Sequence, residues 1–241
     1  MSLSDILKST TPKYHDIVPS TRKKIWYRPF LVKEEKILLI AQEMGGDGGI
    51  MKAVKEVVES CFEGLGDASK IPIFDLEYLF IKLRAKSVQE IAIPILICPV
   101  TSEEIQLKIN LQEIKIVEDK NHSNKIKLSD DIVIGMKYPS ISIFLENNIE
   151  SMELMDFYEL AINCIDYIET KEEKIDCSSI EKNELKQFVD NMTKQQFDKI
   201  IDFFATMPKL EKTVNYKTSD GENRSIVLRG IKDFFGLASV T

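Results

Sequence analysis

The sequence predicts an α+β protein in which helices alternate with small antiparallel β-hairpins. In several segments apolar residues recur at the spacing of three and four that is typical of helices, and in others they alternate with a period of two. The segments with a period of two come in pairs that are separated by short turn sequences, as in hairpins. With 241 residues, 44% of them hydrophobic and 29% charged, the chain is long enough to bury a sizeable core.

The first elements expected along the chain are a hairpin and three helices. Residues 1–14 are polar, contain Pro12, and are expected to be a flexible terminal segment. A hairpin is expected over residues 15–30, because turn-forming residues at 19–23 separate two β-rich stretches. Three segments then carry apolar residues at helical spacing: 34–44, 51–62 and 75–85.

Residues 91–111 are expected to form a second hairpin with one buried face. Isoleucine occupies every odd position from 91 to 97, and apolar residues alternate again over 105–111, after a turn at 99–103. Because side chains alternate between the two faces of a strand, this pattern predicts that the isoleucines point into the core. A third strand is expected at 125–128.

The C-terminal part is expected to be helical and to end in another hairpin. Three segments have a helical apolar period: 152–165, 181–190 and 193–205. Thr193 and Gln196 have the spacing of a helix-capping box. A hairpin is expected over 210–228, and a short turn or helix over 229–235.

The predicted elements suggest a domain organisation and a weak repeat. We expect an N-terminal α+β domain over 15–145 and a helical region with a terminal hairpin over 146–241. A helix followed by a hairpin occurs at 75–114 and again at 193–231, which indicates a weak internal repeat. Two unrelated helix–hairpin units are an equally good interpretation.

Composition and charge argue against several classes of protein. The 32 basic and 39 acidic residues give a net charge of -7, which is unlike a protein whose main task is to neutralise nucleic-acid phosphates. The longest apolar run is far shorter than a membrane-spanning helix, and the first residues lack the pattern of a secretory signal. The four cysteines are widely spaced and are expected to be reduced, which fits work or assembly in a cytoplasm.

No catalytic, cofactor or metal site is expected. The glycine-rich segment Gly45–Gly49 follows a predicted helix, contains Asp47, and lacks the lysine of a phosphate-binding loop, so we interpret it as a helix end and connection. Cys98 lies at a hairpin turn, where a zinc ribbon would place a pair of cysteines. Thr101 stands at the second position, and His122 would be the only imidazole nearby, so zinc lacks its four ligands.

Two other functions are kept as alternatives. A small hydrolase could pair Cys98 with His122, or Ser20 with His15, although no motif supports either pair. A nucleic-acid-binding module could use the basic residues 22–24 beside Trp26.

Several strings, in this order, resemble the baseplate hub proteins of T-even-like, contractile-tailed bacteriophages, a family that includes baseplate hub assembly catalysts. The resemblance covers most of residues 15–140 and, more loosely, the C-terminal hairpin with 230–235. The strings are Trp26–Lys36, Phe74–Phe80, Leu83–Val88, Ile126–Leu128 and Gly135–Pro139.

The resemblance implies a non-enzymatic role in building the central hub of the phage tail baseplate, as a hub component or as an assembly factor. It implies other hub or tail proteins as partners, a homo- or hetero-oligomer, and no cofactor, nucleic acid or membrane. It also implies a place in the virion tail baseplate, or in the host cytoplasm during assembly.

A protein that joins subunits needs apolar and aromatic contact residues rather than convergent titratable groups. Ordinary core packing is the alternative interpretation for each contact candidate. For Asp75, Glu77 and Arg84 we expect helix capping and surface charge. The candidate contacts are Tyr27, Arg28, Phe30, Phe234, Phe235 and Leu237.

Overall fold

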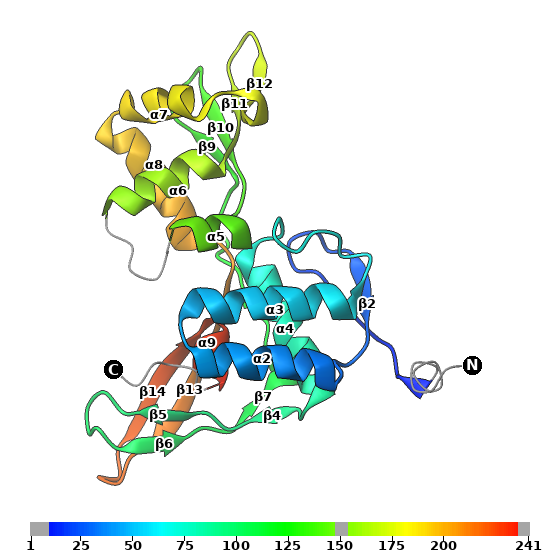
Figure 1. Ribbon diagram of the computed structural model, residues 1–241. Coiled ribbons are helices and arrows are strands. Elements are labelled where there is room, and N and C mark those ends of the chain that lie inside the picture. Colours follow the sequence, from blue (N-terminus) through cyan, green and yellow to red (C-terminus); the bar gives the residue numbers. More distant parts are fainter. Residues whose placement is uncertain (1–9, 148–153, 236–241) are drawn as a thin grey trace. The chain divides into compact units, whose positions relative to one another are not determined.

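The computed structural model describes residues 10–147 and 154–235 (Figure 1). Helices and small antiparallel sheets alternate along the described chain, which confirms the α+β class. By their mutual contacts the residues form two compact units, Met1–Val117 with Lys209–Thr241, and Glu118–Pro208. The predicted domains 15–145 and 146–241 divide the chain at a different point, and this division stays a prediction.

The first unit begins with the predicted hairpin. Strand β1 (Tyr14–Ile17) pairs with β2 (Lys24–Tyr27), and β2 pairs in turn with β3 (Phe62–Glu63). In the turn, the backbone N–H of Val18 donates to the carbonyl of Lys23 over 2.9 Å. The sheet therefore ties the start of the chain to residues that follow the second helix.

Three helices follow, as predicted, with wider bounds. They are α2 (Val32–Met44), α3 (Asp47–Cys61) and α4 (Ile73–Ser87). Helix α4 is the centre of this unit, since its Leu76, Leu79, Ile81 and Leu83 are each 0% exposed.

Only part of the glycine-rich segment forms the predicted connection between helices. Gly45 and Gly46 have φ angles of +68° and +83°, and they alone link α2 to α3. Residues 47–49 already form the first turn of α3. Two glycines suffice because the left-handed region lets the chain reverse between the helices.

The second hairpin forms as two short ladders. Strand β4 (Ile91–Ala92) pairs with β7 (Ile109–Asn110), and β5 (Ile95–Ile97) pairs with β6 (Glu104–Gln106). The predicted inward direction of the isoleucines is wrong: all four at positions 91–97 are 49–65% exposed. The even positions turn inward instead, with Ala92, Pro94 and Cys98 buried and Leu96 partly buried, because Cys98 and its neighbours pack toward Tyr216 of the last hairpin. Because side chains alternate along a strand, a shift of one residue turns every side chain to the opposite face.

The first unit is completed by the end of the chain. Strand β13 (Lys209–Lys217) pairs with β14 (Asn223–Arg229) and with β8 (Ile116–Val117), and α9 (Gly230–Phe235) follows. The 3-10 helix η1 (Leu111–Glu113) is held by a buried lysine. The Nζ of Lys82 donates to the carbonyls of Leu111, Gln112 and Ile114 over 3.4, 2.6 and 2.9 Å.

The second unit is a four-stranded sheet with helices. The order is β12 (Lys174–Asp176), β11 (Ile165–Glu169), β10 (Val133–Met136) and β9 (Lys125–Lys127), with neighbouring strands antiparallel. Its other elements are α5 (Ile141–Asn147), α6 (Leu154–Cys164), the 3-10 helix η3 (Cys177–Ser179), α7 (Lys182–Asp190) and α8 (Lys194–Thr206).

The predicted strand at 125–128 and the last two predicted helices are present in this unit. Strands β10, β11 and β12 were not expected from the sequence. The backbone N–H of Thr193 donates to the side-chain carbonyl of Gln196 over 2.8 Å, so the predicted capping box is formed.

Helix α8 belongs to the second unit and β13–β14 to the first, so the internal repeat stays a prediction. Among the helices of the described residues, none is both long and apolar enough to cross a membrane.

Candidate interaction surfaces

Cys98 is held by hydrogen bonds within its own unit. The hydroxyl of Tyr216 donates to its Sγ over 3.3 Å. Hydrogen bonds from Thr101 and Tyr216 lower the pKa of Cys98 to about 7. A thiol with a lowered pKa is a better nucleophile at neutral pH, yet only 1% of Cys98 is exposed. Thr101, which stands where a zinc ribbon would have its second cysteine, thus stabilises the turn through its hydrogen bonds.

The two histidines have structural surroundings. The Nδ1 of His122 lies 3.0 Å from the hydroxyl oxygen of Thr206, and its Nε2 lies 3.1 Å from the hydroxyl oxygen of Tyr138. Its burial against Phe203 lowers the pKa of His122. The ring of His15 packs on that of Trp26 in a tilted arrangement, with 5.1 Å between ring centroids.

The proposed nucleophile–histidine pairs find no support in this geometry. Ser20, the serine named beside His15, donates both its backbone N–H and its hydroxyl to the carboxylate of Asp75. Cys98 takes its hydrogen bonds from Thr101 and Tyr216, and His122 belongs to the other unit. Within the residues that the structure describes, no three His, Cys, Asp or Glu side chains are grouped as metal ligands would be.

The predicted contact residues lie mostly inside the first unit. Tyr27 is 3% exposed and stacks on Phe62, and Phe234 is 0% exposed. Phe30 is partly buried, and its backbone N–H donates to the hydroxyl of Ser87 over 3.0 Å. The side chain of Phe235 and the whole of Leu237 lie outside the described residues. Contact with a partner through these residues stays a prediction, and Tyr27 and Phe234 would first have to leave the core.

Arg28, the remaining contact candidate, binds residues of its own chain in this structure. Its Nη2 donates to Glu34 over 2.9 Å and to the carbonyl of Ser60 over 3.2 Å. The Glu34 carboxylate also accepts from the backbone N–H of Leu31 over 2.8 Å. Although burial alone would raise it, the bonds from Arg28, Leu31 and Ser60 lower the pKa of Glu34 to about 2. This pair fastens the start of α2 to the end of α3.

The acidic residues of α4 are not surface charges. Asp75 is 0% exposed and accepts the backbone N–H of Ser20 over 3.0 Å, which ties α4 to the first hairpin. Glu77 is partly buried and accepts the backbone N–H of Ile231, so it caps α9 rather than its own helix. Arg84 is partly buried as well. The expectation of surface charge is therefore wrong for Asp75.

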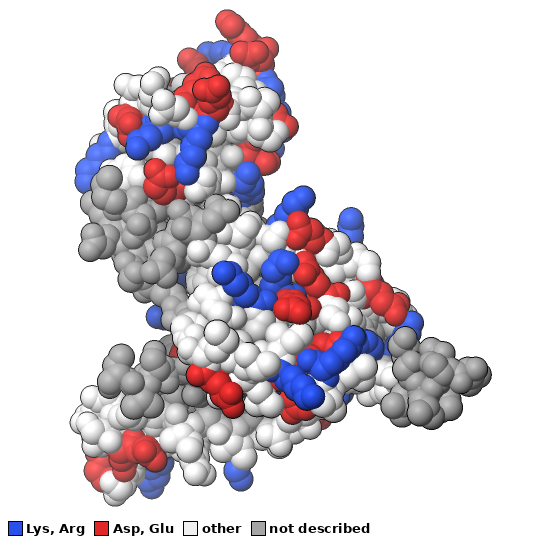
Figure 2. Space-filling view, viewed as in Figure 1, with Lys and Arg blue, Asp and Glu red and all other residues white. Residues whose placement is uncertain are grey.

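A surface that the sequence did not indicate lies on α2. Leu39, Ile40 and Met44 are 52%, 56% and 82% exposed, although Met44 lies at the helical apolar spacing of residues 34–44. The same helix borders an open apolar groove with α3. Figure 2 shows an uncharged area over the C-terminal part of α2, with charged side chains beside it. The groove is lined by Ile37, Ile40, Ala41, Met44, Gly45, Gly49, Lys52, Ala53 and Glu56.

The outer face of the first hairpin is aromatic and basic. Trp26 is 44% exposed, and the Nζ of Lys24 lies 4.8 Å from the centroid of its ring. The pairing of Trp26 with His15, and of Lys24 with Ile17, places all four side chains on this face.

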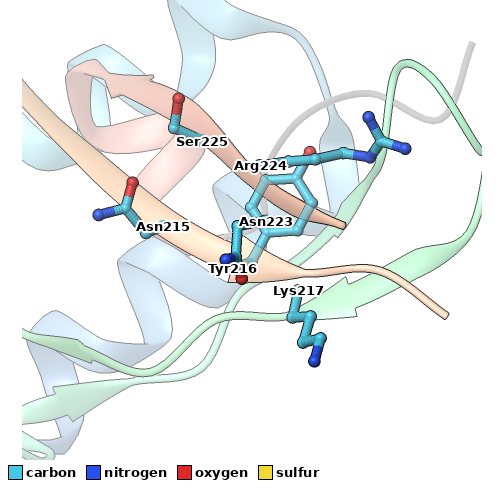
Figure 3. A pocket seen from close by; sticks show the side chains of 6 residues that line it. All are labelled: Asn215, Tyr216, Lys217, Asn223, Arg224 and Ser225. Carbon is cyan, nitrogen blue, oxygen red and sulfur yellow. The ribbon is translucent and has the colours of Figure 1, made fainter. Parts of the chain in front are cut away.

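A hollow at the end of β13 and β14 has no convergent groups. Figure 3 shows that the side chains around it, which include Lys217 and Ser225, point in different directions. The guanidinium of Arg224 is engaged nearby, because its Nε donates to the hydroxyl of Thr218 over 3.1 Å. The hollow is therefore not a candidate for a catalytic or ligand site.

The family of this chain follows from comparison with known proteins. The family model described as T4 bacteriophage base plate protein matches residues 11–236, nearly the whole chain. The chain belongs to this family. The match confirms the resemblance seen in the sequence, and the baseplate protein is a phage tail protein that interacts with other baseplate or tail proteins. Comparison with curated proteins and with solved structures found no match.

Proposed function

We propose that this baseplate protein acts in building the hub of the tail baseplate, as a hub component or an assembly factor, through protein contacts and without covalent catalysis. The observation that carries this proposal is the exposed apolar face of α2. Its partner is another baseplate or tail protein.

Helix α2 exposes apolar side chains that a helix of a globular domain normally buries. Of its 13 residues only Glu34 is buried, while Leu39, Ile40 and Met44 face solvent. An apolar stripe of this kind usually packs on the core of its own domain. Since α2 is already anchored through Arg28 and Glu34, its outward stripe is free to bind another protein.

The groove between α2 and α3 fits an amphipathic helix of the partner. Such a helix presents apolar side chains at positions i, i+3 or i+4, and i+7 to a groove. The flexible side chain of Met44 at its border can adapt to the partner's shape. The charged groups of the lining, Lys52 and Glu56, have opposite signs, so specificity would come mainly from apolar fit.

The chemistry of the unit's polar groups supports a role without catalysis. Asp75, Glu77 and Lys82 are each used to hold one element of the first unit to another. His122 likewise bonds Thr206 and Tyr138 within the second unit. These groups serve the fold, and none converges on a cavity.

Co-expression with the tail proteins of the same phage genome tests the proposal. We expect the tagged chain to co-purify with a baseplate or tail protein, and the Ile40→Asp/Met44→Asp variant to retain at least about tenfold less of it. Val32→Asp is the matched control, because Val32 is 66% exposed on the same helix but does not line the groove. Retention of the partner by the double variant would exclude α2 as the contact. Normal baseplates after deletion of the gene would refute the hub role.

Nucleic-acid binding is a second candidate, favoured by the face around Trp26. Lysine above an exposed indole suits a phosphate backbone with stacked bases. Binding of single-stranded DNA that weakens steeply with salt and is lost in Trp26→Ala would support it. Equal retention of DNA by wild type and Trp26→Ala would count against it.

A further inference from the structure

Strand segment 91–97 presents a row of apolar side chains to solvent. We call Ile91, Ile93, Ile95 and Ile97 the isoleucine row; they are 50%, 49%, 52% and 65% exposed. Of the residues between them, Ala92 and Pro94 are buried and Leu96 is partly buried. Val100, in the turn beyond the row, is 68% exposed as well.

The backbone of the same residues forms an open sheet edge. The carbonyls of Glu90 and Pro94 accept from Leu111 and Leu107 over 2.8 and 3.1 Å, and the N–H of Cys98 donates to Glu103 over 2.9 Å. Even-numbered residues thus direct their backbone groups to the return strand. Because these groups alternate along an antiparallel strand, the N–H and C=O groups of the isoleucine row point to the other edge.

That edge runs along the two short strands β4 and β5 and carries no charged side chain. Among the described strands, β4 pairs only with β7 and β5 only with β6. Pro94, which lacks an N–H, directs its backbone toward the return strand, so it interrupts the pairing inside the hairpin and not the open edge. Soluble proteins usually place lysine or a bulge on such an edge. No charged residue occurs from Ile91 to Ser102.

These features set the chemistry of whatever covers the edge. It must be a β-strand without charges, and it must have apolar residues at alternate positions. The isoleucine row itself meets both requirements. In an antiparallel pair related by a two-fold axis, isoleucines would face isoleucines and no like charges would meet, despite the net charge of -7 of each chain.

We infer that a second copy of this chain covers the isoleucine row by antiparallel pairing of the two open edges. The contact is isologous and closes as a dimer, with the hairpin sheets of the two copies joined into one. It lies on other residues than the α2 face, and it does not depend on the proposed hub role.

Sedimentation of the purified full chain over a range of concentrations tests the dimer. The mass should rise with concentration from 27.6 kDa toward twice that value and then level off. The Ile95→Lys/Ile97→Lys variant should stay at the monomer mass and raise the dissociation constant at least about tenfold, because like charges would meet in the pair. Val227→Lys is the control, since Val227 is 40% exposed on another strand of the unit, and it should dimerise as wild type.

A charge exchange separates strand pairing from a general effect of lysine. Ile95→Glu/Ile97→Glu should also be monomeric alone, and a mixture with Ile95→Lys/Ile97→Lys should regain the dimer mass. In the wild type, amide exchange of Ile93, Ile95 and Ile97 should slow as the concentration rises. This measurement needs no variant, so it also decides the question if the substituted chains fail to fold.

Three results would overturn the inference. They are a wild type that stays monomeric at every concentration, growth beyond the dimer without a plateau, and amide exchange that does not depend on concentration. Monomeric protein that still co-purifies with a tail protein would refute the dimer alone. A dimer without any co-purifying tail protein would count against the hub proposal alone.

Discussion

The phenol ring of Tyr167 fills the space that a side chain at Gly135 would need. The two residues are opposite each other in the ladder of β10 and β11. A Cβ added to Gly135 would overlap the ring. The Nζ of Lys174 lies 3.6 Å from the ring centroid, so a charged group restricts the ring as well. Glycine therefore stands in the interior of a strand because the neighbouring strand places an aromatic ring there.

Gly135→Ala should destabilise the protein by about 1–3 kcal/mol, the usual cost of overpacking a fitted site. Urea unfolding followed by circular dichroism would measure the change in the free energy of unfolding. Combining it with Tyr167→Ala removes the obstacle, so the double variant should be more stable than the sum of the single effects indicates. Additive effects would show that the ring is not the cause.

Gly230→Ala should cost more than Gly221→Ala. Both glycines have left-handed φ angles, +61° and +87°, where alanine costs about 1 kcal/mol or more. A Cβ at Gly230 would also come within 2.7 Å of the Glu77 carboxylate, whereas nothing lies within 4 Å of one at Gly221. Thermal unfolding of the two variants side by side measures the difference. Equal losses would mean that Glu77 moves aside freely.

Stability should fall as the pH rises from about 4.5 through 7, in part because of Glu77. Burial raises the pKa of this carboxyl from its usual 4.5 to about 7, against the bond from the backbone N–H of Ile231. The folded state thus keeps the proton more tightly than the unfolded state, and its advantage is lost as the proton leaves. Glu77→Gln keeps an acceptor for Ile231 and should remove this component. Unfolding curves for both proteins at pH 5 and pH 8 would show it as a smaller pH-dependent loss in the variant.

Helices were predictable because their apolar period is local, and most predicted helices have a counterpart in the structure. Strand β11 was not, because Ile165 directly follows Cys164 without a turn residue, and the helical stripe of α6 continues into the strand. The face of the isoleucine row could not be predicted from alternation alone. Tyr216 decides it, and Tyr216 lies more than a hundred residues further along the chain.

The sequence predicted the type of contact residue, apolar and aromatic, but not which of these side chains are exposed. Sequence pattern identifies an apolar side chain but does not say whether the chain itself covers it. Tyr27 and Phe234 were candidates for partner contacts, with core packing as the alternative, and both are buried, whereas Met44 was placed in the apolar stripe of its helix and is exposed. Arg28 was named as a possible partner contact, which stays a prediction; in the structure its guanidinium donates to Glu34 of the same chain.

Arg28→Met should destabilise the protein by about 3–5 kcal/mol, because it leaves the buried Glu34 carboxylate, only 1% exposed, without its partly buried cation. Lys33→Ala is the matched control: Lys33 reaches the same carboxylate over 3.3 Å but is 69% exposed, so its loss should cost less than about 1 kcal/mol. The pKa of Glu34 is lowered to about 2, so the pair stabilises the fold fully above the usual pKa of 4.5 and loses this effect as the pH falls toward 2. Urea unfolding at pH 7 and pH 3 should therefore show a smaller difference between wild type and Arg28→Met at the lower pH. The same difference at both pH values would mean that Arg28 acts through packing and not through its charge.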